Sequence, residues 1–292
     1  MVAVTLMWAT AGVVTRQLEE ARSFEVTFWR SFFTLLSLLV ILPLWQGRGV
    51  WARMRSGGRA LWISGVCWGV MFTAFMVALT LTRVANVLVT MALGPLLTAL
   101  AARLFIGHRL PARTWAAIVA AGLGIAWMYG SQLGEGLLLG TGVALLVPLA
   151  TACNWTVAQH AHGKGHDIDL VPAVMIGAAI SSLVALPLAW PLQANSHDLR
   201  LLAFLGLFQL AIPCVLSMLC ARVLKAPEVA LLALLEVVFG IALAWVGAGE
   251  EPEASVLIGG VVVIGALIVN EWLGLRDRRG ALEQGLPKPQ RP

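Results

Sequence analysis

The sequence predicts an all-α integral membrane protein with ten transmembrane helices in two inverted five-helix repeats. Three observations lead to this prediction. Of the 292 residues, 59% are hydrophobic and only 12% are charged, whereas a soluble domain carries about 25% charged residues. Apolar segments repeatedly reach the length of about 20 residues that a helix needs to cross a bilayer. The two halves of the chain also match each other at a nearly constant offset.

Ten apolar windows follow one another with short connectors between them. In lipid each window must satisfy its backbone hydrogen bonds internally, so each is expected to be a helix. The first is short for a span if it ends at Thr15, so the helix either continues through Arg16 and Gln17 or starts upstream. No basic segment precedes it, so no cleavable signal peptide is expected. The windows cover residues 1–18, 26–45, 60–81, 84–106, 113–130, 137–159, 170–190, 199–223, 228–248 and 254–273.

The basic residues are divided unequally between the two alternating sets of connectors. One set, near residues 48–59, 103–113, 164, 222–225 and 276–291, holds 15 of the 20 Lys and Arg residues. The other set holds Arg16, Arg22, Arg30, Arg83 and Arg200. Because basic loops stay in the cytoplasm, both termini are expected there, in a multi-pass protein of the cell inner (plasma) membrane. The net charge of +5 then reflects orientation, and no nucleic-acid partner is expected.

The two halves of the chain repeat each other. Adding 142 to a residue number carries Gly94 to Glu236 and His108 to Glu250, and adding 141 carries Ala9 to Ala150. The repeats are expected at residues 1–135 and 136–273, followed by a basic cytoplasmic tail at 274–292 that is expected to be disordered. Five helices is an odd number, so the second repeat enters from the opposite face. This arrangement is typical of transporters with a mid-membrane site between their halves.

Several strings resemble the ten-helix exporters of the drug/metabolite transporter superfamily, which have two EamA-type halves. They are ATAGVVTRQL, FWRSFF and ALGPLLTALAARLFIGHRL in the first half, and LATACNWTVAQH, ALLALLEVVFGIALAWVGAGEEP and LIGGVVVIGALIV in the second. The chain departs from the family's usual pattern at Val237, where proline is expected, and at His108, where glutamate is common. The resemblance implies an exporter of amino acids and related metabolites from a bacterial cytoplasm.

Small or polar side chains recur every four residues in several windows. In window 84–106 they are Asn86, Thr90, Gly94 and Thr98, which share one helix face. Such stripes either line a cavity or let helices approach closely without one. Because the repeat relates the stripes in pairs, a shared cavity is expected. The expected substrate-binding residues are Trp8, Thr10, Met71, Phe75, Thr90, Met91, Gly94, Pro95, Thr98, Asn154, Trp155, Gln209, Pro213, Ser217, Glu236, Phe239 and Gly240.

Glu236 is the one carboxylate well inside a predicted span, where a charge costs about 2.5–3.5 kcal/mol on insertion scales. Three roles stay open for it. It is protonated at rest and couples transport to protons, or it is ionised and receives a substrate ammonium. Alternatively, it is protonated and hydrogen-bonds a helix backbone for packing alone.

The Lys and Arg residues lie at the edges of the predicted spans. Arg30, about one turn into its window, is expected to extend to the outer surface and anchor the helix. The cavity then lacks the positive charge that phosphates or nucleotide sugars require, so a neutral, zwitterionic or cationic small molecule is expected. Its carboxylate would be held by helix ends or by Asn154 and Gln209.

Other classes of protein are less compatible with the sequence. It has no G-x-S-x-G or H-E-x-x-H motif and no P-loop, so neither an enzyme nor an ATP-driven pump is expected. The four cysteines lie in apolar runs, so no disulfide is expected. The histidines of HAHGKGHD fall in a glycine-containing loop, so no metal or cofactor is expected.

Two alternatives to an amino-acid exporter stay open. One is a broad-specificity exporter of cationic or apolar drugs, and the other is a non-transporting channel or scaffold. The expected partners are a small-molecule substrate and the lipid bilayer, with the chain as a monomer or weak homodimer.

Overall fold

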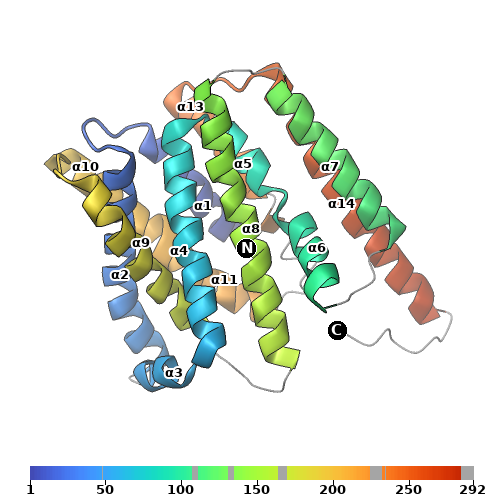
Figure 1. The fold of residues 1–292 in the computed structure, drawn as a ribbon, viewed down its shortest axis with the longest axis horizontal. Helices are drawn as coiled ribbons and strands as arrows, with labels where there is room; N and C mark the ends of the chain where they lie inside the picture. The colour runs from blue at the N-terminus through green and yellow to red at the C-terminus, as the bar shows by residue number, and fades with distance from the viewer. Residues whose placement is uncertain are drawn as a thin grey trace.

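The structure is a computed structural model that describes residues 1–47, 49–106, 111–130, 135–163, 170–223, 232–233 and 235–283. Within these ranges every regular element is a helix (Figure 1), so the all-α prediction is confirmed. The elements are α1 (Val2–Thr15), α2 (Ser23–Gln46), α3 (Val50–Ser56), α4 (Gly58–Leu81), α5 (Val84–Met91), α6 (Gly94–Ile106), α7 (Ala112–Gly130), α8 (Glu135–Gly163), α9 (Val171–Ala189), α10 (Ser196–Phe204), the π-helix η1 (Leu205–Ala211), α11 (Ile212–Val223), α13 (Leu235–Ala248) and α14 (Ala254–Glu283).

Six helical segments in the described ranges are long and apolar enough to cross a membrane. They are Ser23–Gln46, Gly58–Leu81, Val84–Ala101, Val171–Ala189, Ser196–Ser217 and Ala254–Arg276. Three shorter apolar helices are Val2–Thr15, Leu139–Asn154 and Leu235–Ala248. Large hydrophobic side chains on their outer faces are exposed, as expected where lipid replaces water. The chain is a multi-pass membrane protein.

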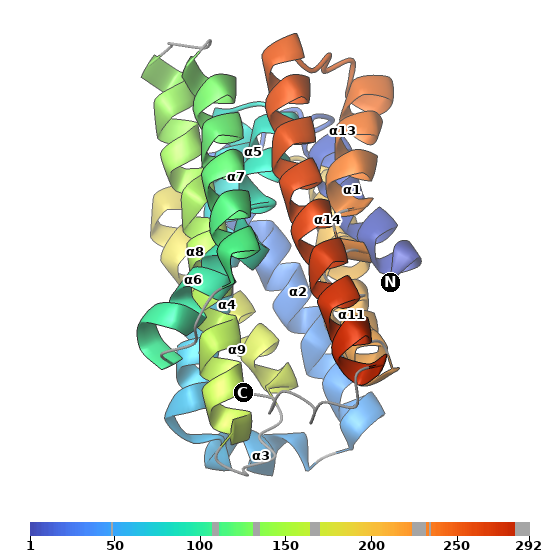
Figure 2. The same ribbon diagram turned by 90° about the vertical axis from the view of Figure 1, so that its right-hand side faces the viewer.

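The helices lie side by side along one common direction (Figures 1 and 2). α7 and α14 pair at one edge of the bundle, and α2 packs against α9 towards the opposite edge. Between them α4 packs against both α8 and α9, and α1 packs against α13. The short helix α3 lies at the lower end of the bundle in both views.

Glycines bring α4 and α9 unusually close together. A Cβ atom built at Gly177 would lie 2.9 Å from the backbone nitrogen of Gly69 and would also meet the side chain of Trp68. One built at Gly65 would lie 2.5 Å from Cγ2 of Ile176. In lipid, helices associate through close packing rather than through the hydrophobic effect, so these small residues determine how tightly the two helices pack.

Two helices are interrupted where the sequence places a proline. The window 84–106 breaks at Ala92 and Leu93, between α5 and α6, and Pro95 occupies the first turn of α6. In the window 199–223 the chain forms η1 directly before Pro213. Proline lacks an N–H and its ring clashes with the carbonyl four residues earlier, here that of Gln209. The wider π-helical turn changes the hydrogen-bond register before that clash arises.

Two features differ from the sequence-based expectation. Helix α3 was not expected, because the segment around Arg53 and Arg55 is too basic to form an apolar window. Helix α14 continues to Glu283, so the part of the tail at 274–283 that was expected to be disordered is helical. No proline interrupts the chain before Pro287, and Arg276 extends over the Trp272 ring at 5.9 Å, which favours continuation of the helix. Residues 284–292 lie outside the described residues.

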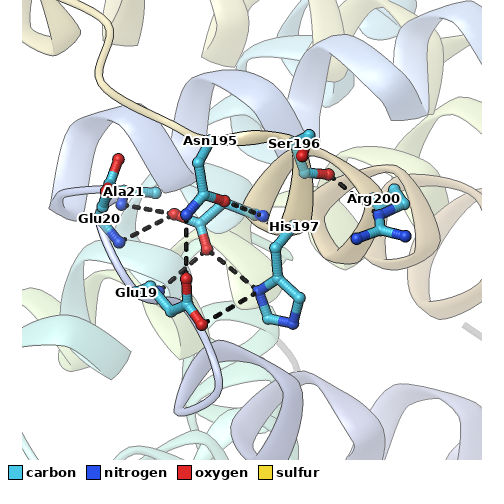
Figure 3. A network of polar contacts seen from close by, with 8 residues as sticks. Glu19, Glu20, Ala21, Asn195, Ser196, His197 and Arg200 are labelled. Atoms are coloured by element: carbon cyan, nitrogen blue, oxygen red, sulfur yellow. Dashed lines mark hydrogen bonds and ion pairs between the residues drawn. The ribbon is translucent and has the colours of Figure 1, made fainter.

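Buried carboxylates tie the loops together at the upper end of the bundle in Figure 1. Asp198, 0% exposed, accepts hydrogen bonds from the backbone N–H groups of Glu19, Glu20 and Ala21 at 2.8–2.9 Å (Figure 3). Asn195 caps α10 by accepting from the Asp198 N–H at 2.8 Å. The loop before α2 is therefore held by the first turn of α10.

The reverse contact is made from the first turn of α2. The buried carboxylate of Glu25 accepts from the backbone N–H groups of Gln193 at 2.8 Å and Ala194 at 2.7 Å. These residues belong to the loop before α10, so each helix holds the loop that precedes the other.

A third tie at this end joins α1, α5 and the loop after α13. Glu250 accepts from Nε of Arg16 at 2.9 Å and from the backbone N–H of Val84 at 2.8 Å. Arg16 also donates to the carbonyl of Thr82 at 2.8 Å. We call the end that carries the contacts of Asp198, Glu25 and Glu250 the tied end.

We expect Gly177→Ala to destabilise the protein by about 1–3 kcal/mol, because the new methyl group overpacks the α4–α9 interface. Gly142→Ala is the matched control, since a Cβ there has no atom within 4 Å. It should be neutral or stabilising by up to about 1 kcal/mol, as for glycine to alanine in a helix. Thermal unfolding in detergent measures both, and equal melting temperatures would contradict the assigned interface.

We expect Asp198→Ala to lower the free energy of unfolding by about 1–3 kcal/mol or more, because three backbone donors lose their buried acceptor. The loop at 16–22 should also become accessible to trypsin at Arg16 and Arg22. Glu20→Ala, which removes an exposed carboxylate and leaves the Glu20 backbone N–H in place, is the control. Equal tryptic cleavage rates for the two variants would show that Asp198 does not hold this loop.

Candidate substrate-binding site

Several of the predicted site residues meet where α4, α6 and α8 pack together. The Thr151 hydroxyl lies 3.1 Å from Sδ of Met71. A Cβ built at Gly94 would find Cγ2 of Thr151 as its nearest neighbour, at 3.9 Å. Met71, Phe75 and the half-buried Met91 belong to one hydrophobic cluster. The side chains that the structure places here are apolar and adaptable.

A second group meets where α1, α5, α13 and η1 pack together. Nε2 of Gln209 donates to the backbone carbonyl of Trp8 at 3.3 Å. Gly240 faces α1 and α5, since a Cβ there would meet the side chain of Leu88 and would lie 3.9 Å from Cα of Ala9. Gln209 is 2% exposed, and its Oε1 has no hydrogen-bond partner in the described part of the chain.

The hydroxyl groups among the predicted residues are bonded within their own helices. They donate to carbonyls three or four residues earlier, as follows: Thr10 to Met7, Thr90 to Asn86, Thr98 to Gly94 and Ser217 to Cys214. Such bonds use the only donor of each hydroxyl. These residues can still accept a hydrogen bond from a ligand through the lone pairs of their hydroxyl oxygens. Their contacts are explained equally well if the stripes only allow the helices to pack closely.

Three other predicted residues are placed differently from this core. Asn154 is engaged with α4, since its Oδ1 accepts from the Ser64 hydroxyl at 2.6 Å. Pro213 is buried at the start of α11, and Phe239 is half-buried on α13. The side chain of Trp155 lies outside the described residues.

Pro95 and Gly94 are adjacent in sequence but face different sides of α6. Pro95 is exposed and lines a cavity of about 170 Å³ between α6, α7 and α14. Arg113, Asn270 and Glu271 supply polar groups to the same cavity. Gly94 turns towards Thr151 instead, so the Gly-Pro pair contributes to two different sides of α6.

Glu236 lies in the first turn of α13 and is partly exposed. It forms no hydrogen bond or ion pair with any residue that the structure describes. Its carboxyl group and the Arg30 guanidinium both lie within electrostatic range of the buried Cys214 thiol on α11. An acid and a base therefore approach the same region of the interior.

The position of Arg30 corrects the sequence-based expectation. Its side chain does not extend to the surface but is 1% exposed, so it is not a surface anchor. The guanidinium carbon lies 5.7 Å from the ring centroid of Phe72 and 5.6 Å from that of Phe75. The expectation that every Lys and Arg stays at the edge of the bundle is therefore wrong for this residue.

One signal in the sequence could have indicated the direction of Arg30. Thr27, Ser31 and Thr34 share its helix face through spacings of three and four residues, and all of them are buried. A polar stripe of this kind does not face lipid. Hydroxyl contacts of 2.9 Å join Ser31 to Ser181, and Ser181 to Thr73, at the junction of α2, α4 and α9.

Comparison with known proteins confirms the resemblance noted in the sequence. The model of the EamA-like transporter family matches residues 1–130 and 138–271. The Pseudopaline exporter CntI of Pseudomonas aeruginosa is 24% identical over 247 residues, in strain UCBPP-PA14 and in strain PAO1. Each alignment covers 84% of this chain and 84% of the relative.

One solved structure, described only as the crystal structure of a protein, shares the fold. It aligns with a TM-score of 0.60 at 20% sequence identity and covers 94% of this chain and 96% of that chain. Since the family match extends over nearly all of the described helices, the chain belongs to the EamA-like transporter family and is a membrane transporter rather than an enzyme.

Proposed function

We propose that the protein is a secondary transporter that exports small metabolites across the bacterial inner membrane by alternating access. Amino acids with neutral or aromatic side chains are the proposed substrates. The observation that carries the proposal is the paired way in which the helices of the first and second halves contact each other. The two Pseudomonas aeruginosa relatives are named as exporters, which supports the direction of transport.

The helix contacts are those that a two-fold axis in the membrane plane would require. If α1 corresponds to α8, α2 to α9 and α7 to α14, the pairs α2–α9 and α7–α14 each relate a helix to its own counterpart. If α6 likewise corresponds to α13, the contact of α1 with α13 is the counterpart of the contact of α8 with α6. If α4 corresponds to η1, the contact of α4 with α9 is the counterpart of the contact of η1 with α2. This pattern supports ten spans in two inverted repeats, at residues 1–135 and 136–273.

The tied end is the outer end in the orientation that the basic residues favour, with both termini in the cytoplasm. The contacts of Glu250 and Asp198 join loops from both proposed repeats at that end. In this orientation the described conformation is closed towards the outside. Alternating access requires some of these contacts to break when the transporter opens outwards.

The chemistry of the interior supports a substrate with an apolar side chain. Met71, Phe75 and Met91 provide flexible thioethers and an aromatic ring at the junction of the two proposed repeats. The same wall would also suit a broad-specificity exporter of apolar or cationic drugs, which is the second candidate function.

Counterflow in proteoliposomes tests the proposal. We expect saturable exchange of a radiolabelled neutral or aromatic amino acid, because a carrier offers one site alternately to each side. An imposed pH gradient should change the steady-state accumulation if protons are coupled to transport. Drug exchange without amino-acid exchange would favour the second candidate, an unsaturable leak would favour a channel, and no flux at all would favour a scaffold.

We expect Glu236→Gln to reduce amino-acid transport by about tenfold or more, because a neutral amide neither carries a proton nor pairs with an ammonium group. Glu251→Gln, at an exposed residue of the loop after α13, is the matched control. Initial rates of counterflow measure the effect. Normal transport by Glu236→Gln from about pH 5 to pH 8 would assign the carboxyl group to packing alone.

A further inference from the structure

We propose that the Arg30 guanidinium binds the carboxylate of the transported substrate. The inference rests on the proposed function and specifies the chemistry of its site. It replaces the expectation that the interior holds no positive charge and that a carboxylate would be bound by helix ends, Asn154 or Gln209.

Arg30 carries a permanent positive charge and is buried, so its N–H groups need hydrogen-bond acceptors within the protein or a ligand. An arginine side chain stays protonated in proteins, so burial cannot be relieved by loss of a proton. Arg30 lies seven residues after Ser23, about 10 Å along α2 from its start. Its Nε and Nη1 atoms are buried and have no hydrogen-bond partner among the residues that the structure describes.

The two fully buried acids of the tied end are already engaged elsewhere. Glu25, on the same helix, accepts from the backbone of Gln193 and Ala194. Asp198, at the start of α10, is used by the loop at 19–21. Arg30 forms no ion pair within the described part of the chain.

The two aromatic rings stabilise the positive charge but leave its donors unused. Phe72 and Phe75 lie within 6 Å of the guanidinium, the range in which a cation interacts with the face of a ring. A ring does not supply the oxygen acceptor that an N–H group requires. A carboxylate does, and its hydrogen bonds to arginine are charge-assisted and strong.

A complementary acceptor lies on the neighbouring element. η1 packs closely against α2, since a Cβ built at Gly206 would lie 2.9 Å from the Arg30 carbonyl oxygen. Gln209, on the same π-helix, has a buried Oε1 without a partner in the described ranges. An unpaired donor group and an unpaired acceptor on adjoining elements suit a ligand that carries both a carboxylate and an ammonium group, such as an amino acid.

Binding to the purified full chain in detergent tests the inference with three related probes. 3-Phenylpropionate has the carboxylate only, phenethylamine has the ammonium only, and phenylalanine has both. We expect Arg30→Met to weaken binding of phenylalanine and 3-phenylpropionate by about tenfold or more, the loss of a hydrogen bond to a charged group. Phenethylamine affinity should stay within about twofold. Isothermal titration calorimetry measures all three dissociation constants.

Arg22→Met is the matched control, because Arg22 is exposed at the start of the same helix. It should leave the three affinities unchanged. Arg30→Lys, which keeps the charge but loses the planar fork, should bind 3-phenylpropionate with intermediate affinity. If Arg30→Met does not fold, the wild-type protein decides: it should bind 3-phenylpropionate about tenfold or more tightly than the neutral 3-phenylpropanamide.

Three results would overturn the inference: equal wild-type affinity for the carboxylate and its amide, an equal loss of all three probes in Arg30→Met, or no carboxylate binding by the wild type. The proposed transport function is decided separately. Arg30-dependent binding without amino-acid exchange in proteoliposomes would keep this site and reject amino-acid transport. Undiminished exchange by Arg30→Met would keep transport and reject the site.

Discussion

A permanent charge buried in a membrane must find its partner inside the protein, because lipid offers no water to solvate it. Arg30 places this constraint on the junction of α2, α4, α9 and η1. Two phenylalanine rings over the guanidinium meet this requirement in part, but they supply no hydrogen-bond acceptor. The unused N–H groups that remain are the chemical basis for the proposed binding of a substrate carboxylate at this point.

The contacts at the tied end differ in strength in a way that suits a transporter. Asp198 is fully buried and holds three backbone N–H groups, so this tie is a lasting part of the fold. The side chains of Arg16 and Glu250 are 31% and 15% exposed, and ion pairs of this kind contribute only about 0.2–1 kcal/mol. The second contact is therefore the weaker of the two, while the first keeps the loop before α2 on α10.

The helix interruptions near Pro95 and Pro213 also lie in the interior of the bundle. The break between α5 and α6 comes just before Pro95, and η1 precedes Pro213, so both prolines follow a departure from regular α-helical hydrogen bonding. Non-helical backbone is tolerated at membrane depth only where protein or a polar cavity covers it. Gln209 on η1 and Gly94 at the start of α6 accordingly lie in the interior. Glu236, near the start of α13, approaches the same region from the other proposed half.

The effects of hydropathy and of proline on a helix depend only on residues that are close together in the sequence. They can therefore be predicted from the sequence directly. Hydropathy predicted the helical membrane class and the order of the apolar helices, and the motif strings predicted the family. The outward or inward direction of Arg30 was not readable in this way. Its flexible stem can reach the surface or the interior, and Phe72 and Phe75, distant in sequence, create the site that holds it inside. Likewise, only packing against α7 and α14 separates Pro95 from Gly94, because the face that a helical residue presents is decided by the helices that surround it.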